Sequence, residues 1–211
     1  DQLIGYQTKG KENMINQQWM NATDMFNKVE DLLSDFNLTG GIFLNNFRDY
    51  SATEPLITVY GLTQAYLNST STKKWFNVST DFNYNLCNGD VYQWWYSDFM
   101  KSVSDILSFV IQRTRVLLFN GADDIEVNTS GVLDFIRQLD WPGIKNFLKA
   151  PRQIWNSSYG ILGSAKTYGN LTFVTVSGAG HMVPYYQPYS ALDMVLRFVS
   201  NNTNWTKPFQ H

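Results

Sequence analysis

Arg115-Val-Leu-Leu-Phe-Asn-Gly121 and Leu171-Thr-Phe-Val-Thr-Val-Ser177 are the two stretches that decide the fold of this chain. Both are short, apolar and rich in β-forming residues, so we expect each to be a buried strand. A tight-turn signal at Gly169-Asn170 predicts that residues 159–168 pair with the second stretch as a hairpin. Each stretch leads into a polar loop and then into a segment with helical spacing. This alternation predicts an α/β fold.

Apolar residues that recur every three or four positions predict helices around these strands. Residues 12–36 have the pattern of one or two amphipathic helices, and Gly40-Gly41 with the polar stretch 45–53 separates them from the next helical segment. The other expected helices are 56–67, 96–112, 131–139 and 187–200, with a short helical turn that starts at 141–143.

The length of 211 residues fits one domain, or one large fragment of a bigger domain. We place a soft boundary near residues 71–83, which separates a helical segment 1–75 from an α/β part 76–211. The first residue is Asp1 rather than Met, and the sequence does not open with a charged region followed by an apolar run, so we expect that any targeting peptide is already gone or was never included. We therefore expect a processed chain or a fragment.

The composition excludes several classes of protein. Hydrophobic residues make up 44% and charged residues 16%, which excludes a disordered chain and a coiled coil. The net charge of −2 comes from scattered charges, so nucleic acid is not an expected partner. The sequence has no apolar run close to the roughly 20 residues of a membrane helix, and a membrane is not an expected partner either.

Nine Asn-X-Ser/Thr sequons indicate a protein of the secretory route. The 20 Asn and 32 Ser plus Thr of the sequence would form only about three sequons by chance. We expect glycans at eight of them and regard Asn128 as a doubtful site, because it lies four residues beyond a candidate catalytic acid. The eight expected sites are Asn21, Asn37, Asn68, Asn77, Asn156, Asn170, Asn201 and Asn204.

The candidate chemistry lies in the two loops that follow the predicted strands, where open α/β sheets bind their ligands. The first loop carries Asp123, Asp124 and Glu126, and the second carries His181. The only other histidine is the last residue, His211. On the residues alone, the acidic cluster is more typical of a solvated turn, and the histidine could be a structural residue. One interior His and one Cys do not make an ordinary metal site, so we expect no metal and no cofactor.

An acid after one strand and a histidine after the next match the last two members of the Ser, Asp, His order of α/β hydrolases. Asn120-Gly-X-X-Asp124 and Gly178-Ala-Gly-His181-Met182-Val-Pro184-X-X-Gln187-Pro188 resemble the C-terminal half of the serine carboxypeptidases, which are vacuolar and lysosomal α/β hydrolases. The resemblance runs from about Trp19 to Phe198. It implies part of a mixed sheet with helices on both faces, preceded by a helical cap segment.

The resemblance also implies roles for single residues. Asp124 would be the acid of the triad and His181 the base, while Met182 would border the pocket for a substrate side chain. The histidine would take the proton of a serine hydroxyl, and the aspartate would orient the imidazole. Asp123 and Glu126 would be bystanders. Gly178 and Gly180 would let the chain turn tightly beneath the histidine.

The nucleophile of such a triad is missing, because the sequence contains no Gly-X-Ser-X-Gly elbow. The resemblance implies that the serine lies in an N-terminal half or partner chain, and that the predicted strands form one edge of a sheet of about eight strands centred there. Cys87, the single cysteine, resembles the family position that bonds to that half. A free buried thiol is the alternative.

The sequence therefore predicts a serine-type carboxypeptidase that removes C-terminal residues from peptides. The resemblance further implies action at acidic pH in a lysosome or vacuole, or outside the cell. Two alternatives stay open: an acyltransferase or lyase of the same fold, and a non-catalytic homologue that acts as a binding partner.

Overall fold

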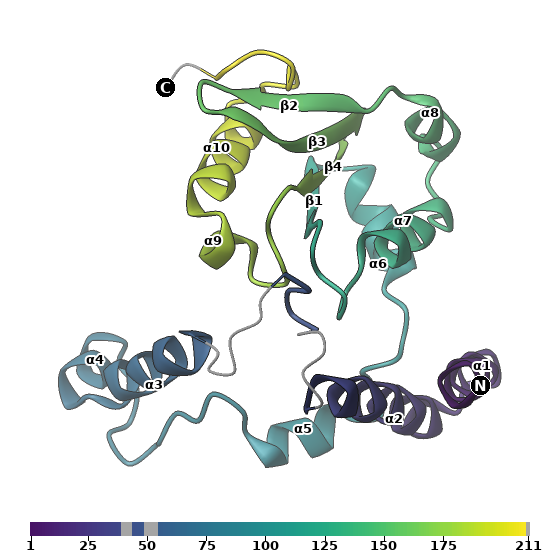
Figure 1. The fold of residues 1–211 in the computed structure, drawn as a ribbon. Helices are drawn as coiled ribbons and strands as arrows, with labels where there is room; N and C mark the ends of the chain where they lie inside the picture. Colours follow the sequence, from purple (N-terminus) through teal and green to yellow (C-terminus); the bar gives the residue numbers. More distant parts are fainter. Residues whose placement is uncertain (39–43, 49–54, 210–211) are drawn as a thin grey trace. The chain divides into compact units, whose positions relative to one another are not determined.

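The chain folds into two compact units in a computed structural model that describes residues 1–38, 44–48 and 55–209, without the side chains of 34–38 and 55–58 (Figure 1). The helical unit comprises Asp1–Leu32 and Ser51–Lys101, and the sheet unit comprises Leu33–Tyr50 and Ser102–His211. The boundary predicted near residues 71–83, between a helical segment 1–75 and an α/β part 76–211, stays a prediction. The expected break at Gly40-Gly41 lies outside the described residues.

A four-stranded mixed sheet forms the centre of the sheet unit. Its strands are β1 (Val116–Gly121), β2 (Gln153–Ser157), β3 (Gly160–Tyr168) and β4 (Leu171–Val176), in the spatial order β1-β4-β3-β2. The pair β1 and β4 is parallel, whereas β4 with β3 and β3 with β2 are antiparallel. The strand at 116–121 and the hairpin around Gly169 confirm the predicted elements.

Helices cover both faces of this sheet, as Figure 1 shows. Alternate residues of β4 point to opposite faces, because side chains alternate along a strand. Leu171 and Phe173 join one buried apolar cluster, and Val174 and Val176 join another. The first cluster packs against residues of α6 (Ser104–Ile111), α7 (Thr129–Arg137) and α8 (Ile144–Lys149), and the second against α9 (Val183–Tyr186) and α10 (Pro188–Val199).

The sequence patterns missed or displaced several elements. The edge strand β2 was not predicted, because Gln-Ile-Trp-Asn-Ser has no clear alternation and its pairing with β3 shifts register between Trp155 and Asn156. The helix expected over 96–112 is only α6, which begins at Ser104. The predicted helices 131–139 and 187–200 correspond to α7 and α10.

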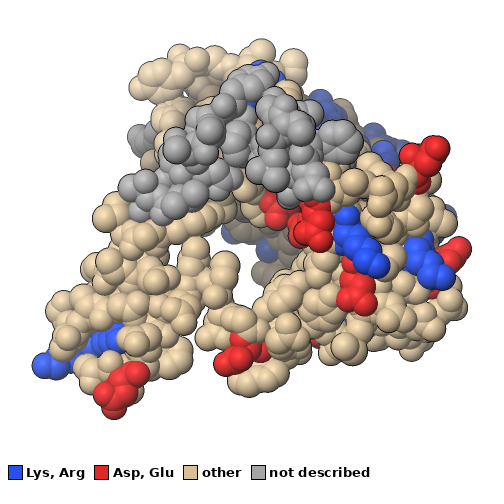
Figure 2. All heavy atoms as spheres, turned by 60° about the horizontal axis from the view of Figure 1, so that its bottom comes forward, with Lys and Arg blue, Asp and Glu red and all other residues tan. Residues whose placement is uncertain are grey.

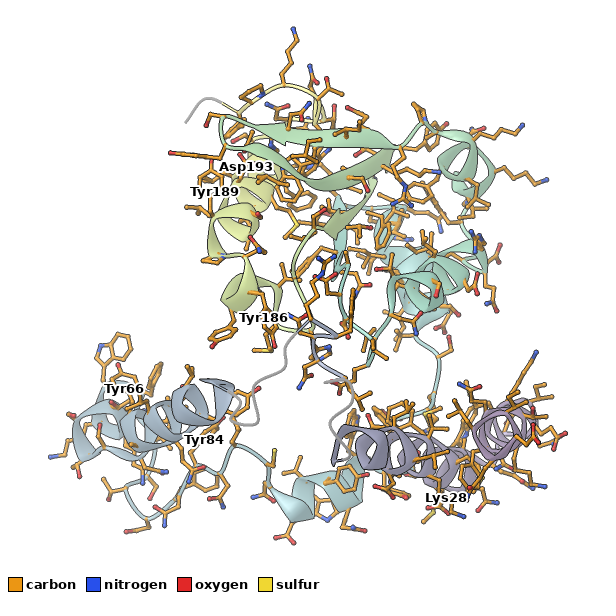
Figure 3. The ribbon with its side chains drawn as sticks, in the orientation of Figure 1. Lys28, Tyr66, Tyr84, Tyr186, Tyr189 and Asp193 are labelled. Carbon is orange, nitrogen blue, oxygen red and sulfur yellow. The ribbon has the colours of Figure 1, made fainter. Side chains whose placement is uncertain are left out.

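The helical unit contains α1 (Gln2–Ile15), most of α2 (Trp19–Leu38), α3 (Pro55–Asn68), α4 (Thr70–Trp75) and α5 (Gly89–Trp95). The predicted segment 12–36 is thus two helices, which part at Gln17 with a φ of 56°. Lys28 of α2 lies over the ring of Tyr6 of α1, 5.7 Å from its centroid; Figure 3 labels Lys28. Within the described residues, no helix combines the length and the apolar character needed to cross a bilayer.

The contact between α2 and the end of α5 is polar. The Tyr96 hydroxyl donates to Asp24 Oδ1 at 2.5 Å, and the side chain of Asn27 bonds to the hydroxyl groups of Tyr92 and Tyr96. The hydrogen bond to Asp24 raises the pKa of Tyr96 to about 12, because the carboxylate favours the protonated phenol.

Candidate active site

The two loops with ionisable residues leave the sheet at the same edge. Because β1 and β4 run parallel with Gly121 opposite Val176, their following loops start side by side. We call residues 122–128 the acid loop and residues 177–182 the histidine loop. Ala122 N donates to Val176 O at 2.9 Å, and Asp123 N donates to Ala179 O at 2.9 Å.

Glycines allow the two loops to approach this closely. A Cβ atom on Gly121 would lie 2.2 Å from Gly180 O and 2.4 Å from Ala179 O, which no side chain can tolerate. Gly178 has a φ of +68°, the left-handed region that favours glycine, and so makes the expected tight turn. Gly180 is required for a different reason: a Cβ there would lie 2.0 Å from Asn45 O.

The structure brings Asp124 and His181 together, although they are 57 residues apart. His181 Nδ1 lies 3.1 Å from Asp124 Oδ2, with side-chain exposures of 36% for the histidine and 2% for the aspartate. Asp124 Oδ1 also accepts from Val127 N at 2.9 Å, and Asn120 Nδ2 lies 3.4 Å from Asp124 Oδ2. An ionised carboxylate only accepts hydrogen bonds, so Nδ1 carries the imidazole proton and Nε2 is the basic nitrogen.

The pKa of His181 is raised above its ordinary value. The hydrogen bond to Asp124 is the largest cause, and the charges of Glu126 and Asp124 act in the same direction. Partial burial opposes the shift, because it disfavours the charged imidazolium.

The acid loop is not the solvated turn that its composition allowed. Asp123 is 1% exposed and Asp124 is 5% exposed. Asp123 Oδ2 lies 2.8 Å from Nε of Arg48. Among the described residues, this oxygen accepts no hydrogen bond, so its contact with Arg48 is an ion pair. Glu126 is exposed, and its negative charge contributes to the raised pKa of His181. The roles expected for Asp123 and Glu126 stay predictions.

Two further candidate residues lie at the surface. Met182 is 37% exposed and immediately precedes α9, next to the histidine. Cys87 is exposed in the helical unit, before α5, and forms no disulfide among the described residues. Their proposed roles in substrate binding and in an interchain disulfide stay predictions.

The candidate glycosylation sites differ in their surroundings. The Nδ2 atoms of Asn68, Asn156 and Asn170 donate to the carbonyl oxygens of Tyr84, Thr206 and Ile111, at 2.8, 3.0 and 2.9 Å. The side chain of Asn128 caps α7 through Gly131 N. The Asn37 side chain and His211 lie outside the described residues. Asn21, Asn77, Asn201 and Asn204 are exposed, as is the doubtful site Asn128.

Residues 44–48 contact both loops, and sequence analysis did not single them out. They belong to a polar stretch that was predicted only as a break between helices, and their contacts involve mainly backbone atoms.

Asn120 belongs to a motif noted in the sequence, but no structural role was predicted for it. In the structure its Nδ2 lies near Asp124 and donates to Val127 O at 2.8 Å. Backbone partners of this kind leave no pattern in the sequence.

Charged side chains lie dispersed on the face drawn in Figure 2, where Lys and Arg alternate with Asp and Glu among uncharged residues. In residues 1–38, 44–48 and 55–209, no group of three or more His, Cys, Asp and Glu could hold a metal ion.

Comparison with known proteins identifies the family. The family described as serine carboxypeptidase matches residues 4–201. A probable serine carboxypeptidase of Dictyostelium discoideum is 34% identical over 94% of this chain and 40% of its own length. Carboxypeptidase Y of Candida albicans is 36% identical over 65% of this chain and 26% of its own length.

A solved structure shows the same fold. A prohormone-processing carboxypeptidase from Saccharomyces cerevisiae superposes with a TM-score of 0.70 and 21% identity, over 95% of this chain and 47% of that one. The predicted α/β-hydrolase architecture is thereby confirmed, and the chain spans less than half the length of these relatives. The chain belongs to the serine carboxypeptidase family.

Proposed function

We propose that the complete protein is a serine-type carboxypeptidase that releases C-terminal amino acids from peptides, and that this chain supplies its catalytic acid and base. The observation that carries the proposal is the contact of 3.1 Å between Asp124 Oδ2 and His181 Nδ1. Family membership supports it, since the relatives named above are carboxypeptidases.

The geometry suits general acid and base catalysis. Asp124 holds the imidazole with Nδ1 protonated, so Nε2 can take the proton of a serine Oγ as that oxygen attacks the scissile carbonyl. The imidazolium then returns this proton to the leaving amine, and a water molecule repeats the cycle on the acyl-enzyme. Burial of Asp124 strengthens its interaction with the imidazolium, because few water molecules screen the charge.

The serine has to come from outside these residues, since the 211-residue sequence contains no Gly-X-Ser-X-Gly elbow. We propose an N-terminal half or partner chain that carries it and is disulfide-linked through Cys87, which is exposed. β1 supports this arrangement, because one of its edges pairs with β4 and the other has no partner strand among the described residues.

Substrate contacts and compartment follow from the same proposal. Met182 would border the pocket for a substrate side chain, since it is exposed beside the candidate base. The excess of sequons supports a glycoprotein of a lysosome or vacuole, or a secreted one. Asn77, Asn201 and Asn204 suit glycans best, because all three are exposed and the side-chain hydrogen bonds of Asn201 and Asn204 use Oδ1 rather than Nδ2.

The experiment that tests the partner is gel electrophoresis of the native protein with and without reductant, followed by labelling with a serine-reactive fluorophosphonate. A second chain that is released by reduction, contains the serine elbow and takes up the label supports the proposal. A native protein without a reactive serine would instead support a non-catalytic binding partner. A labelled protein that transfers acyl groups but leaves peptides intact would support the acyltransferase alternative.

The experiment that tests the residues is a pair of histidine variants of the complete protein. His181→Ala should lower kcat for peptide hydrolysis by roughly 10³-fold or more, because the serine loses its base. His211→Ala removes the other histidine and serves as the matched control with unchanged kcat. Equal activity of the two variants would exclude His181 as the base.

A further inference from the structure

We propose that residues 44–48 form a clamp that holds the acid loop against the histidine loop, and that the Arg48–Asp123 ion pair helps to position the acid loop against this clamp. The inference rests on the proposed function and adds positioning residues to it. Neither Arg48 nor Asp123 contacts the reacting atoms in this proposal. They act through Asp124 and His181.

The clamp binds the acid loop through three backbone hydrogen bonds. Ile125 N and Glu126 N both donate to Leu44 O, at 3.0 and 3.2 Å, and Phe47 N donates to Asp123 O at 3.1 Å. These bonds lie on both sides of Asp124 in the chain. Hydrogen bonds from the clamp to the residues before and after Asp124 therefore hold its backbone in position.

The same clamp binds the histidine loop. His181 N donates to Asn45 O at 2.6 Å, so the backbone of the candidate base is bonded directly to the clamp. The fit leaves no room for a side chain at position 180, where a Cβ would lie 2.0 Å from Asn45 O and 2.7 Å from Asn46 Cβ. Asn46 is 7% exposed, and its Oδ1 accepts from Arg48 N at 3.0 Å, which shapes the turn.

The electrostatic attraction between Arg48 and Asp123 holds the clamp against the acid loop. The side chain of Asp123 is 2% exposed and that of Arg48 is 65% exposed, with 2.8 Å between Nε and Oδ2. A buried carboxylate needs a compensating charge, because its own hydration is lost. In the structure, Arg48 supplies this charge beside Asp123. Because Asp123 needs a nearby cation, Arg48 and the end of the clamp are held close to the acid loop.

The consequence concerns the 3.1 Å contact of the triad residues. Asp124 and His181 lie on different loops, so their separation depends on how the loops sit relative to each other. Small displacements of catalytic groups cost large factors in rate. A loosened clamp should therefore lengthen the contact, lower kcat and return the pKa of His181 toward its ordinary value.

The test uses single and double variants of the complete protein. Asp123→Asn keeps the size of the side chain and should lower kcat about 10-fold, with KM changed less than about twofold. Arg48→Ala leaves a buried carboxylate without its cation and should lower kcat further, by about 100-fold. The double variant Arg48→Ala with Asp123→Asn should recover to the level of Asp123→Asn alone, because the two residues act as one unit.

The matched control is the ion pair of Arg137 with Asp134 on α7, which also joins an arginine to an aspartate in the sheet unit. Both side chains of that pair are exposed, and neither lies in the two loops or the clamp. Asp134→Asn and Arg137→Ala should leave kcat and its pH dependence unchanged. Melting temperatures of all variants separate a loss of folding from a loss of positioning.

Proton NMR of the His181 Nδ1–H resonance provides a readout that does not depend on turnover. In Asp123→Asn, the resonance should weaken or shift, and the pKa of His181 should fall. If kcat, the pH profile and this resonance stay as in the wild type, the proposal is overturned. It is equally overturned if activity falls only in proportion to the melting temperature.

Failure of the proposed function would look different. In that case the wild-type protein would neither take up fluorophosphonate nor hydrolyse peptides, whereas the His181 resonance would still respond to Asp123→Asn if the clamp positions the loops.

Discussion

Single residues of the site set the protonation state of the candidate base. His181 is hydrogen-bonded to a buried carboxylate and lies in the field of Glu126, and both raise its pKa. A general base must be neutral, so the rate should fall as the pH drops through this raised pKa. The described residues thus work against the acidic optimum that the family resemblance implies. Activity at acidic pH would require groups outside the described residues to lower the pKa of His181.

The first prediction concerns Glu126, whose exposed carboxylate is outside the pair of Asp124 and His181. Glu126→Gln should lower the pKa of His181, because it removes a negative charge that favours the imidazolium. The acidic limb of the pH profile of kcat/KM should then move to lower pH. Glu12→Gln, in the helical unit, is the control with an unmoved profile. A shift to higher pH would contradict the assignment of His181 as the base.

Protonation of His181 also affects the stability of the fold, and its effect on stability is opposite to its effect on the rate. The folded pKa of His181 is raised, so protonation favours the folded state. This contribution is fully present below the unfolded pKa and is lost as the pH rises through the folded pKa.

At the scale of elements, the acid loop and the histidine loop form the site, and they can pack closely because Gly121 has no side chain. β1 ends at Gly121, where the strand passes within contact of the histidine loop. The parallel pairing of β1 and β4 brings the loops to one edge, and the absence of a side chain at this position lets them touch. The loops would separate if that position held a larger residue.

The second prediction is therefore that Gly121→Ala disrupts both loops. The new Cβ would meet backbone oxygens at 2.2 and 2.4 Å, and backbone atoms can move only if the loops part. We expect a loss of stability of about 1–3 kcal/mol, as for overpacked sites, and loss of the His181 Nδ1–H resonance. Gly131→Ala in α7 is the control, since its Cβ would make ordinary contact at 3.4 Å. Equal melting temperatures for the two variants would contradict this explanation.

A second element-scale feature is the buried Arg197 of α10, which is 0% exposed. Its Nε donates to Asp193 Oδ2 at 2.6 Å, and Trp155 Nε1 of β2 donates to the same oxygen at 2.7 Å; Asp193 is labelled in Figure 3. The Arg197 guanidinium also donates to the carbonyl oxygens of Asn204, Asn156 and Lys207. This network ties α10 to β2 and to the segment after the helix.

The third prediction is that Arg197→Met lowers the free energy of unfolding by about 3–5 kcal/mol, because it leaves the Asp193 carboxylate buried without its cation. Urea unfolding of the complete protein measures the change. Arg137→Met, at an exposed ion pair on α7, should cost less than about 1 kcal/mol. A cost for Arg197→Met as small as that of the control would show that the network does not stabilise the fold.

At the scale of the whole molecule, two exposed surfaces of the described chain could bind a partner. One edge of β1 has no partner strand among the described residues. An apolar stripe on α10 is also exposed, where Leu192, Val195 and Val199 are 57%, 46% and 60% accessible. Unpaired strand edges and apolar patches favour association. Both surfaces agree with a chain that spans about 40% of the length of its relative in Dictyostelium.

The fourth prediction is that residues 1–211 produced alone form soluble aggregates and bind a hydrophobic dye, whereas co-production with the proposed serine-bearing half gives a single species. Size-exclusion chromatography with light scattering measures both states. A Cys87→Ser variant, made with the other half, separates the disulfide from non-covalent association. A monodisperse, cooperatively folded 1–211 without dye binding would argue against the proposed serine-bearing half.

Local patterns in the sequence determined the strands β1 and β4, the hairpin at Gly169, the helices α7 and α10, and the loops that carry Asp124 and His181. These features follow from contiguous residues, because alternation, helical spacing and turn chemistry act over a few positions. Only the tertiary structure decided the rest: the burial of Asp123, the clamp at residues 44–48, the edge strand β2 and the Arg197 network. These features depend on contacts with residues distant in the chain, and the clamp is formed mainly by backbone atoms common to every residue, so no local pattern marks them.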